Sequence, residues 1–158
     1  MAAHSVHVDK ILFLEAFGRD IPFHDAVAQS TYLDLETGDV MGFYDDDEEA
    51  YMEVGIPVED NRSLREQVAS TPDRYLEIPG LDHNEHHEIL REFLASDSIE
   101  DPVLRAQAQE AYSGSIGRWK EAVADEGIVH QFYQFCDDAV RARAEAFLQE
   151  HGVQVVWR

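Results

Sequence analysis

The stretch TYLDLETGDVMGFYD, residues 31–45, decides the fold. Large residues alternate with small or acidic residues on either side of Thr37-Gly38, the pattern of two β-strands joined by a turn at the glycine. Outward from this hairpin, RYLEIPGL over residues 74–81 predicts a short strand that ends at Pro79-Gly80. After Gly152, VQVVW predicts a closing strand.

Helical signals flank these strands. Asp9 is suited to cap a helix over KILFLEAFGRD, in which apolar residues recur at helical spacing. A second helix-like segment lies near SLREQVAS, residues 63–70. From Asp82 to Gly152 the pattern is helical in three or four pieces, and Asp82 with Glu85 forms a capping box before the first of them.

Helices and strands in this order predict an α+β fold in one compact domain, residues 1–158. We expect a small antiparallel or mixed sheet of three or four strands packed with four to six helices. An acidic hairpin region is expected at residues 30–60 and a helical region at residues 82–151. The single cysteine, Cys136, excludes an internal disulfide and fits a reducing compartment, so we expect a cytoplasmic, bacterial protein.

The chain is strongly acidic. It has 33 aspartates and glutamates against 12 lysines and arginines, a formal net charge of -21 at pH 7. Such a charge repels nucleic acid and anionic lipid and speeds encounter with a basic partner. No apolar run approaches the ~20 residues of a membrane span, and the N-terminal segment lacks the pattern of a secretory signal. The composition predicts a basic protein partner, no direct nucleic-acid binding and no membrane insertion.

The acidic charge is concentrated around the hairpin. Between Asp20 and Asn61 there are thirteen acidic residues and no lysine or arginine. A solvated face is the simpler interpretation, and a surface that imitates nucleic acid is the alternative. Same-face residues of a strand are ~6.7 Å apart, whereas each DNA strand carries a phosphate every ~3.4 Å of axis, so a mimic needs two adjacent rows. The two rows expected on the hairpin are Asp34, Glu36 and Asp39 beside Asp45 and Asp47.

Several pieces of the chain resemble one known family. YLDLETGDV, then RYLEIPGLD before a capped helix, then FYQFCDDAVRARAEAFLQEHGV follow in the order and spacing of an uncharacterised bacterial family, number 0158 of the UPF series, across residues 30–155. Here the family's basic segment is replaced by YSGSIGRWKEAV, and Cys136 stands where the family has arginine. The resemblance implies a compact cytosolic domain and brings no activity with it.

Three of the eight histidines lie in LDHNEHHEIL, residues 81–90. Helical geometry places His86 on the apolar stripe, so we expect it to face the core. His83 and His87 are four residues apart, the spacing of two zinc ligands on one helix. The pattern is not H-E-x-x-H, and a packed helix is the simpler interpretation. The candidates for a third ligand are Glu88, His24 and His130.

Other catalytic signals are weak. The chain has no nucleophile elbow, P-loop, dinucleotide fingerprint or complete calcium loop, so no cofactor is predicted. Cys136 shares its helical positions with apolar residues and is expected to be buried. Arg143 lies on the same stripe, and we expect it to reach the rim or to pair with an acid such as Asp34.

The function predicted from the sequence is a non-enzymatic acidic interaction protein. It would bind and modulate a basic partner, such as a nuclease, a nucleic-acid-binding regulator or a toxin, with mimicry of nucleic acid as one mechanism. The alternative is a small hydrolase-like enzyme that uses His83 and His87, with or without a divalent metal. The candidate partner-binding residues are Asp34, Glu36, Asp39, Tyr44, Asp45, Asp46, Asp47, Glu48, Glu49 and Tyr51.

Overall fold

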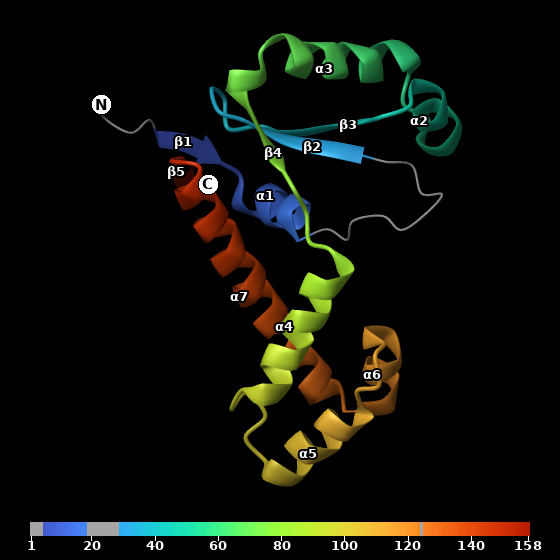
Figure 1. Cartoon of the computed structure of the whole chain (residues 1–158), viewed down its shortest axis with the longest axis vertical. Helices are drawn as coiled ribbons and strands as arrows, with labels where there is room; N and C mark the ends of the chain where they lie inside the picture. The colour runs from blue at the N-terminus through green and yellow to red at the C-terminus, as the bar shows by residue number, and fades with distance from the viewer. Residues whose placement is uncertain (1–4, 19–28, 124) are drawn as a thin grey trace. The chain divides into compact units, whose positions relative to one another are not determined.

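The computed structural model describes residues 5–18, 29–123 and 125–158. The chain divides into two compact units, one formed by residues 1–81 with 144–158 and the other by residues 82–143. The helices and strands form an α+β fold, as the sequence predicted; Figure 1 shows them coloured along the chain.

A three-stranded antiparallel sheet organises the first unit, with strand order β3-β2-β4. The central strand β2 (Gln29–Asp34) pairs with β3 (Val40–Tyr44) and with β4 (Tyr75–Ile78). The hairpin predicted from residues 31–45 is confirmed, and Gly38 occupies its turn with φ +81. A Cβ on Gly38 would lie 1.8 Å from the backbone oxygen of His7, so only glycine fits at this position.

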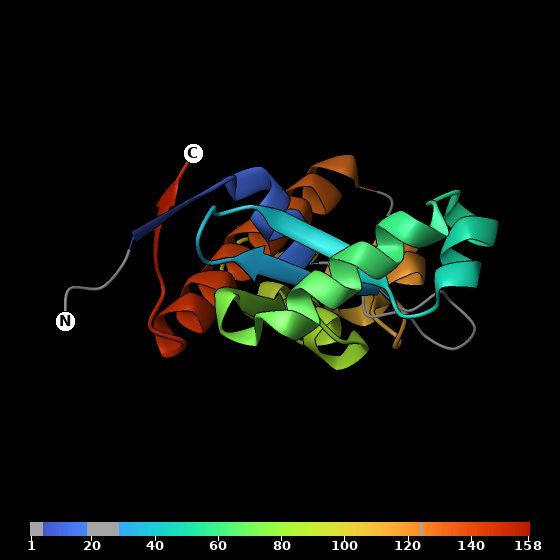
Figure 2. The same ribbon diagram turned by 90° about the horizontal axis from the view of Figure 1, so that it is seen from above.

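Two helices follow the hairpin, α2 (Asp47–Val54) and α3 (Val58–Ser70). Seen from above in Figure 2, α3 crosses the sheet. Its apolar side chains pack on the sheet, because Val68 and the partly buried Leu64 join the core cluster of Phe43 and Tyr75. Apolar burial of this kind stabilises by about 25 cal/mol per Å² removed from water.

A second, two-stranded sheet lies in the same unit and joins the two ends of the described chain. β1 (Ser5–Val8) pairs in parallel with β5 (Gln154–Trp157). Asp9 caps α1 (Lys10–Phe17), as predicted, by accepting a hydrogen bond from the backbone nitrogen of Leu12 at 3.0 Å. Ring contacts connect α1 with β5 and with the end of α7: they are Phe13–Trp157, Phe13–Phe17 and Phe17–Phe147.

The second unit is helical. It contains α4 (His83–Ala95), α5 (Pro102–Ala111), α6 (Ile116–Val123) and residues 126–143 of α7 (Glu126–Glu150). Its core is an aromatic cluster of Phe93, Trp119 and Phe132, with ring centroids 5.2–6.2 Å apart. The predicted capping box at the start of α4 is confirmed, since Asp82 and Glu85 make both of its hydrogen bonds.

The architecture differs from expectation in two details. The described residues contain seven α-helices instead of four to six, and two small sheets instead of one. The additional helix is α2, whose first residue, Asp47, was expected in an extended acidic row. The additional strand is β1, whose partner β5 lies at the other end of the sequence.

Candidate functional site

The strongest candidate site is built around α2. Asp46 is the N-cap of this helix, and its side chain accepts hydrogen bonds from the backbone nitrogens of Glu48 at 2.9 Å and Glu49 at 3.0 Å. Acidic side chains in a first helical turn are stabilised by the positive end of the helix dipole. Gly55, with φ +78, ends the helix in the left-handed conformation that glycine adopts without strain. The acidic run therefore folds into a capped helix.

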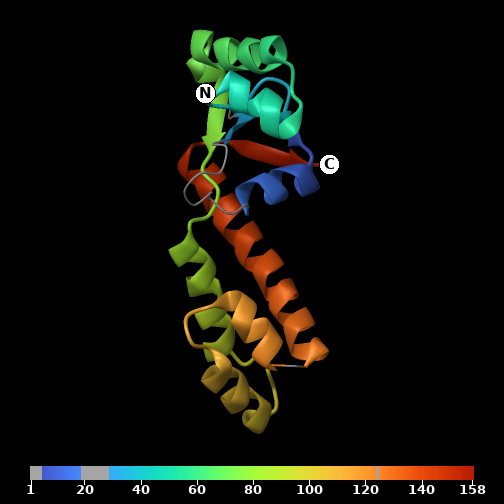
Figure 3. The ribbon, with the colours of Figure 1, turned by 90° about the vertical axis from the view of Figure 1, so that its right-hand side faces the viewer.

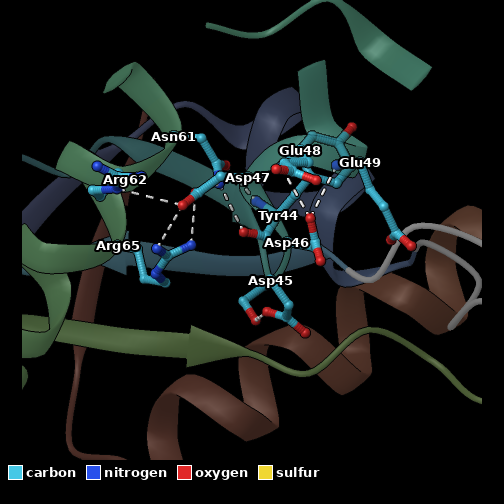
Figure 4. A network of polar contacts seen from close by, with 10 residues as sticks. Tyr44, Asp45, Asp46, Asp47, Glu48, Glu49, Asn61, Arg62 and Arg65 are labelled. Atoms are coloured by element: carbon cyan, nitrogen blue, oxygen red, sulfur yellow. Dashed lines mark hydrogen bonds and ion pairs between the residues drawn. The ribbon is translucent and has the colours of Figure 1, made fainter. Parts of the chain in front are cut away.

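Asp47 fixes α2 to α3. Its two carboxylate oxygens accept hydrogen bonds from both terminal nitrogens of Arg65, at 2.7 and 2.9 Å, and Arg62 lies 3.5 Å away. The Arg65 guanidinium, followed by the Asn61 amide, holds the pKa of the Asp47 carboxyl far below its ordinary value. Asp47 is thus committed to an internal contact, as Figure 4 shows.

Asn61 is the second anchor of this region, and its side chain is buried, with 1% exposed. The amide nitrogen donates to the carbonyl oxygen of Tyr44 at 2.9 Å and to Asp47 at 2.6 Å. The amide oxygen accepts from the backbone nitrogen of Tyr44 at 2.7 Å. Because a buried, unsatisfied backbone group costs about 1–3 kcal/mol, Asn61 stabilises the end of β3 and the start of α2 together.

The outer surface of α2 combines charge with apolar area. The side chains of Tyr51, Met52 and Val54 are 57%, 79% and 51% exposed. The acidic residues exposed on or next to this helix are Asp45, Asp46, Glu48 and Glu49. We call these seven residues the α2 surface. Exposed apolar side chains bordered by charge are typical of surfaces that bind other proteins.

The acids of the hairpin itself have a different role. Asp34 is buried, and it accepts two hydrogen bonds from Arg74, at 3.0 and 2.8 Å, and two from the turn nitrogens of Glu36 and Thr37. Arg74 lowers the pKa of Asp34 to about 2. The Glu36 carboxylate lies 2.8 Å from the same guanidinium. Asp34 therefore closes the turn and is not available to a partner.

The expected pair of acidic rows on the hairpin is wrong. Asp34 points into the turn network, Asp45 lies beyond the end of β3, and Asp47 begins a helix. Asp39 is exposed near the start of β3, with its carboxylate 3.8 Å from Arg158. The phosphate-like spacing that a two-stranded mimic would need is not formed by these residues.

The three histidines of α4 are arranged differently from the expectation. His87 is buried and His86 is only half-buried, so His87 and not His86 is the core-facing residue. The Nδ1 atom of His87 contacts the hydroxyl of Tyr112, and its ring lies 4.2 Å from that of the exposed His83. Burial, followed by the charge of His83, lowers the pKa of His87. The neutral imidazole is favoured as a result.

No third metal ligand joins this histidine pair within the described chain. Among those residues, no group of three or more His, Cys, Asp or Glu side chains is arranged to hold a metal ion. Of the three candidates, Glu88 is exposed, His130 lines a separate groove with Tyr133, and His24 lies outside the described residues. The pair His83 and His87 remains a prediction.

Two further expectations concern α7. Arg143 pairs with Glu92 of α4, at 3.2 Å, and not with Asp34, which Arg74 already neutralises. Cys136 is half-buried instead of buried, and burial raises the pKa of its thiol to about 11. A thiol with such a pKa is protonated at neutral pH, so Cys136 is a poor nucleophile.

Sequence reasoning missed the residues that hold the α2 surface in place. Asn61 and Arg65 are four apart on α3, and their acceptors, the Tyr44 carbonyl and the Asp47 carboxylate, lie before and within α2. The available signal in the sequence was the helical spacing of two polar residues, Asn61 and Arg65. This spacing did not indicate which groups their side chains contact.

Comparison with family models, with curated proteins and with solved structures gives no match for this chain. The resemblance to family 0158 of the UPF series therefore stays a prediction. Among the described helices, none is long and apolar enough to span a bilayer.

Proposed function

We propose that this protein binds and modulates a basic protein partner through the α2 surface, without catalysing a reaction. The observation that carries the proposal is the position of Tyr51, Met52 and Val54 on the surface of one helix whose first turn is acidic. Because these three side chains stay in water, their exposed apolar surface contributes no burial free energy to folding. A partner that covers them would gain that free energy on binding.

The charge of the α2 surface supports a basic partner. Arg62 and Arg65 of α3 already contact Asp47, whereas Glu48 and Glu49 are exposed. With a net charge of -21, the protein attracts cations over about 8–10 Å at physiological ionic strength. Attraction would speed the encounter, and burial of Tyr51 and Met52 would supply specificity.

Nucleases, nucleic-acid-binding regulators and toxins are the basic partners that fit this proposal. The version in which the hairpin imitates two rows of phosphates loses its support, because the rows do not form. The alternative, a hydrolase-like enzyme at His83 and His87, is less well supported because no third ligand lies beside them among the described residues.

The experiment uses a cationic probe of defined shape. An amphipathic helical peptide of lysine and leucine is titrated against the protein, with a scrambled peptide of the same composition as control. We expect the amphipathic peptide to bind about tenfold more tightly, since one buried apolar side chain contributes about 1.5–3 kcal/mol. Equal affinity of the two peptides would mean that only net charge is recognised, and the proposal would be abandoned.

Matched variants localise the binding. Met52→Ser should reduce the preference for the amphipathic peptide. Val103→Ser, at another exposed apolar residue on α5, should not. Glu48→Gln with Glu49→Gln should weaken binding more than Glu110→Gln with Glu121→Gln, although both pairs remove two exposed acids. If the variants within each pair behave alike, the α2 surface is not the binding site.

A further inference from the structure

The outer edge of β5 is a second surface with a defined chemistry. The two-stranded sheet contains β1 and β5, and no other described strand pairs with β5. The backbone nitrogen of Arg158 donates to the carbonyl oxygen of Val8 at 2.9 Å, and the carbonyl oxygen of Arg158 accepts from Lys10 at 3.2 Å. Since backbone groups alternate along a strand, those of Val155 and Trp157 point away from β1.

A groove lies between β5 and the end of α7. Its volume is about 490 Å³, the size of a pocket that takes several side chains. One wall is β5, with Val155 and Trp157, and the other is the end of α7, with Glu145 and Leu148. Figure 3 shows α7 continuing into β5, and the turn between them is fixed by Gly152, whose φ of +68 permits the reversal. A strand that paired with Val155 and Trp157 would lay alternate side chains into the groove.

The groove attracts positive charge. Glu145 lines it, and Glu150 lies in the last turn of α7, which has no basic residue. The carbonyl groups at a helix C-terminus carry a partial negative charge, which a lysine or arginine side chain stabilises by about 0.3–1 kcal/mol. A second copy of this chain would bring another charge of -21 to the same edge, so self-pairing is opposed.

We propose that β5 binds an extended, cationic peptide segment by addition of a strand at its outer edge. Backbone hydrogen bonds to Val155 and Trp157 supply affinity, apolar side chains fill the groove, and a lysine or arginine lies beside Glu145. The α2 surface contributes no residue to this site. The two proposals can therefore fail separately.

The probe is a short peptide of alternating lysine and valine. The control peptide has the same sequence, with N-methyl groups on the backbone nitrogens that would pair with β5. Trp157 lines the groove and reports binding by fluorescence, and the second tryptophan, Trp119, is buried and adds a constant background. We expect saturable binding of the first peptide and about tenfold weaker binding of the second, since the hydrogen bonds to the carbonyl oxygens of Val155 and Trp157 are lost. Equal binding of the two peptides would overturn the proposal.

Variants of the chain separate edge pairing from simple attraction. Val155→Pro removes an outward nitrogen while leaving the nitrogens that face β1, so peptide binding should be lost with the fold retained. Glu145→Gln should weaken binding severalfold, and Glu121→Gln, an exposed acid on α6, should leave it unchanged. Met52→Ser should have no effect, which distinguishes this site from the α2 surface.

Two outcomes would refute strand addition even if Val155→Pro proved unstable. Full binding of the N-methylated peptide by the wild-type protein would show that backbone pairing is not used. Sedimentation gives the second outcome. If the wild-type protein formed a dimer that Glu145→Gln strengthened and that the alternating peptide did not disrupt, a second copy would occupy the edge.

Discussion

Asp34 and Glu48 carry the same charge, but only one of them is available to a partner. Asp34 is buried among the turn nitrogens and Arg74, whereas Glu48 is exposed on α2. The sequence separates Asp34 from Arg74 by forty positions, and nothing in a local pattern pairs them. The composition could therefore predict an acidic surface, but not which carboxylates form it.

The contribution of Asp34 to stability is expected to depend on pH. Arg74 lowers its pKa in the folded protein to about 2, from an ordinary value of 3.8. A depressed folded pKa means that the stabilisation is complete above about pH 4 and is lost as the pH falls toward about 2. At neutral pH, Asp34→Asn should lose about 1 kcal/mol of unfolding free energy, after allowance for screening by solvent.

Urea unfolding of the wild type and of Asp34→Asn at several pH values measures this effect. The difference between the two proteins should shrink below about pH 4. Asp39→Asn, an exposed change in the same turn, is the control. A difference that stays constant down to about pH 2.5 would show that Arg74 does not act through the charge of Asp34.

Elements with local start and stop signals were predicted well. Asp9 and Asp82 each cap the helix that follows, because a cap requires only the next few residues. β1 was missed because its four residues are stabilised by β5, at the other end of the sequence. α2 was missed because its first residue, Asp47, was placed in a strand row, although Asp46 and Gly55 are suitable caps.

The cap of α2 provides a test at this scale. Asp46→Ala should destabilise α2 by about 1 kcal/mol, because the backbone nitrogens of Glu48 and Glu49 lose their acceptor. Asp45→Ala removes the same charge and an exposed hydrogen bond from the Ser30 hydroxyl but no cap, so it is the matched control. Amide hydrogen exchange should increase across α2 in the first variant and not in the second.

The same pair of variants separates structure from charge in binding. If α2 presents Tyr51 and Met52 to a partner, Asp46→Ala should weaken binding of the amphipathic peptide more than Asp45→Ala does. Similar losses would show that the peptide responds to charge alone. Unchanged exchange in Asp46→Ala would show that the contact of Asp47 with α3 is sufficient to hold the helix.

At the scale of the whole molecule, the excess of acidic residues opposes folding. Twelve cationic side chains face 33 acidic ones, and the best-placed cations, such as Arg65 and Arg74, are already in ion pairs. Folding brings the remaining carboxylates closer together, and their repulsion is reduced by salt. Salt also weakens the ion pairs, but these neutralise only part of the charge.

We therefore expect sodium chloride to stabilise the protein. Raising its concentration from about 10 to about 150 mM shortens the screening length from about 30 to about 8 Å. A gain of about 1 kcal/mol would raise the Tm by about 2–4 °C for a chain of this length. Calorimetry with and without salt measures the shift, and sucrose of equal osmolality controls for exclusion of the solute from the surface.

The Tm of Glu48→Gln with Glu49→Gln should respond less to salt than that of the wild type, because two of the repelling charges are gone. A Tm that falls with salt would mean that ion pairs such as Asp47–Arg65 outweigh the repulsion, and that the charge of this protein is balanced locally despite its total.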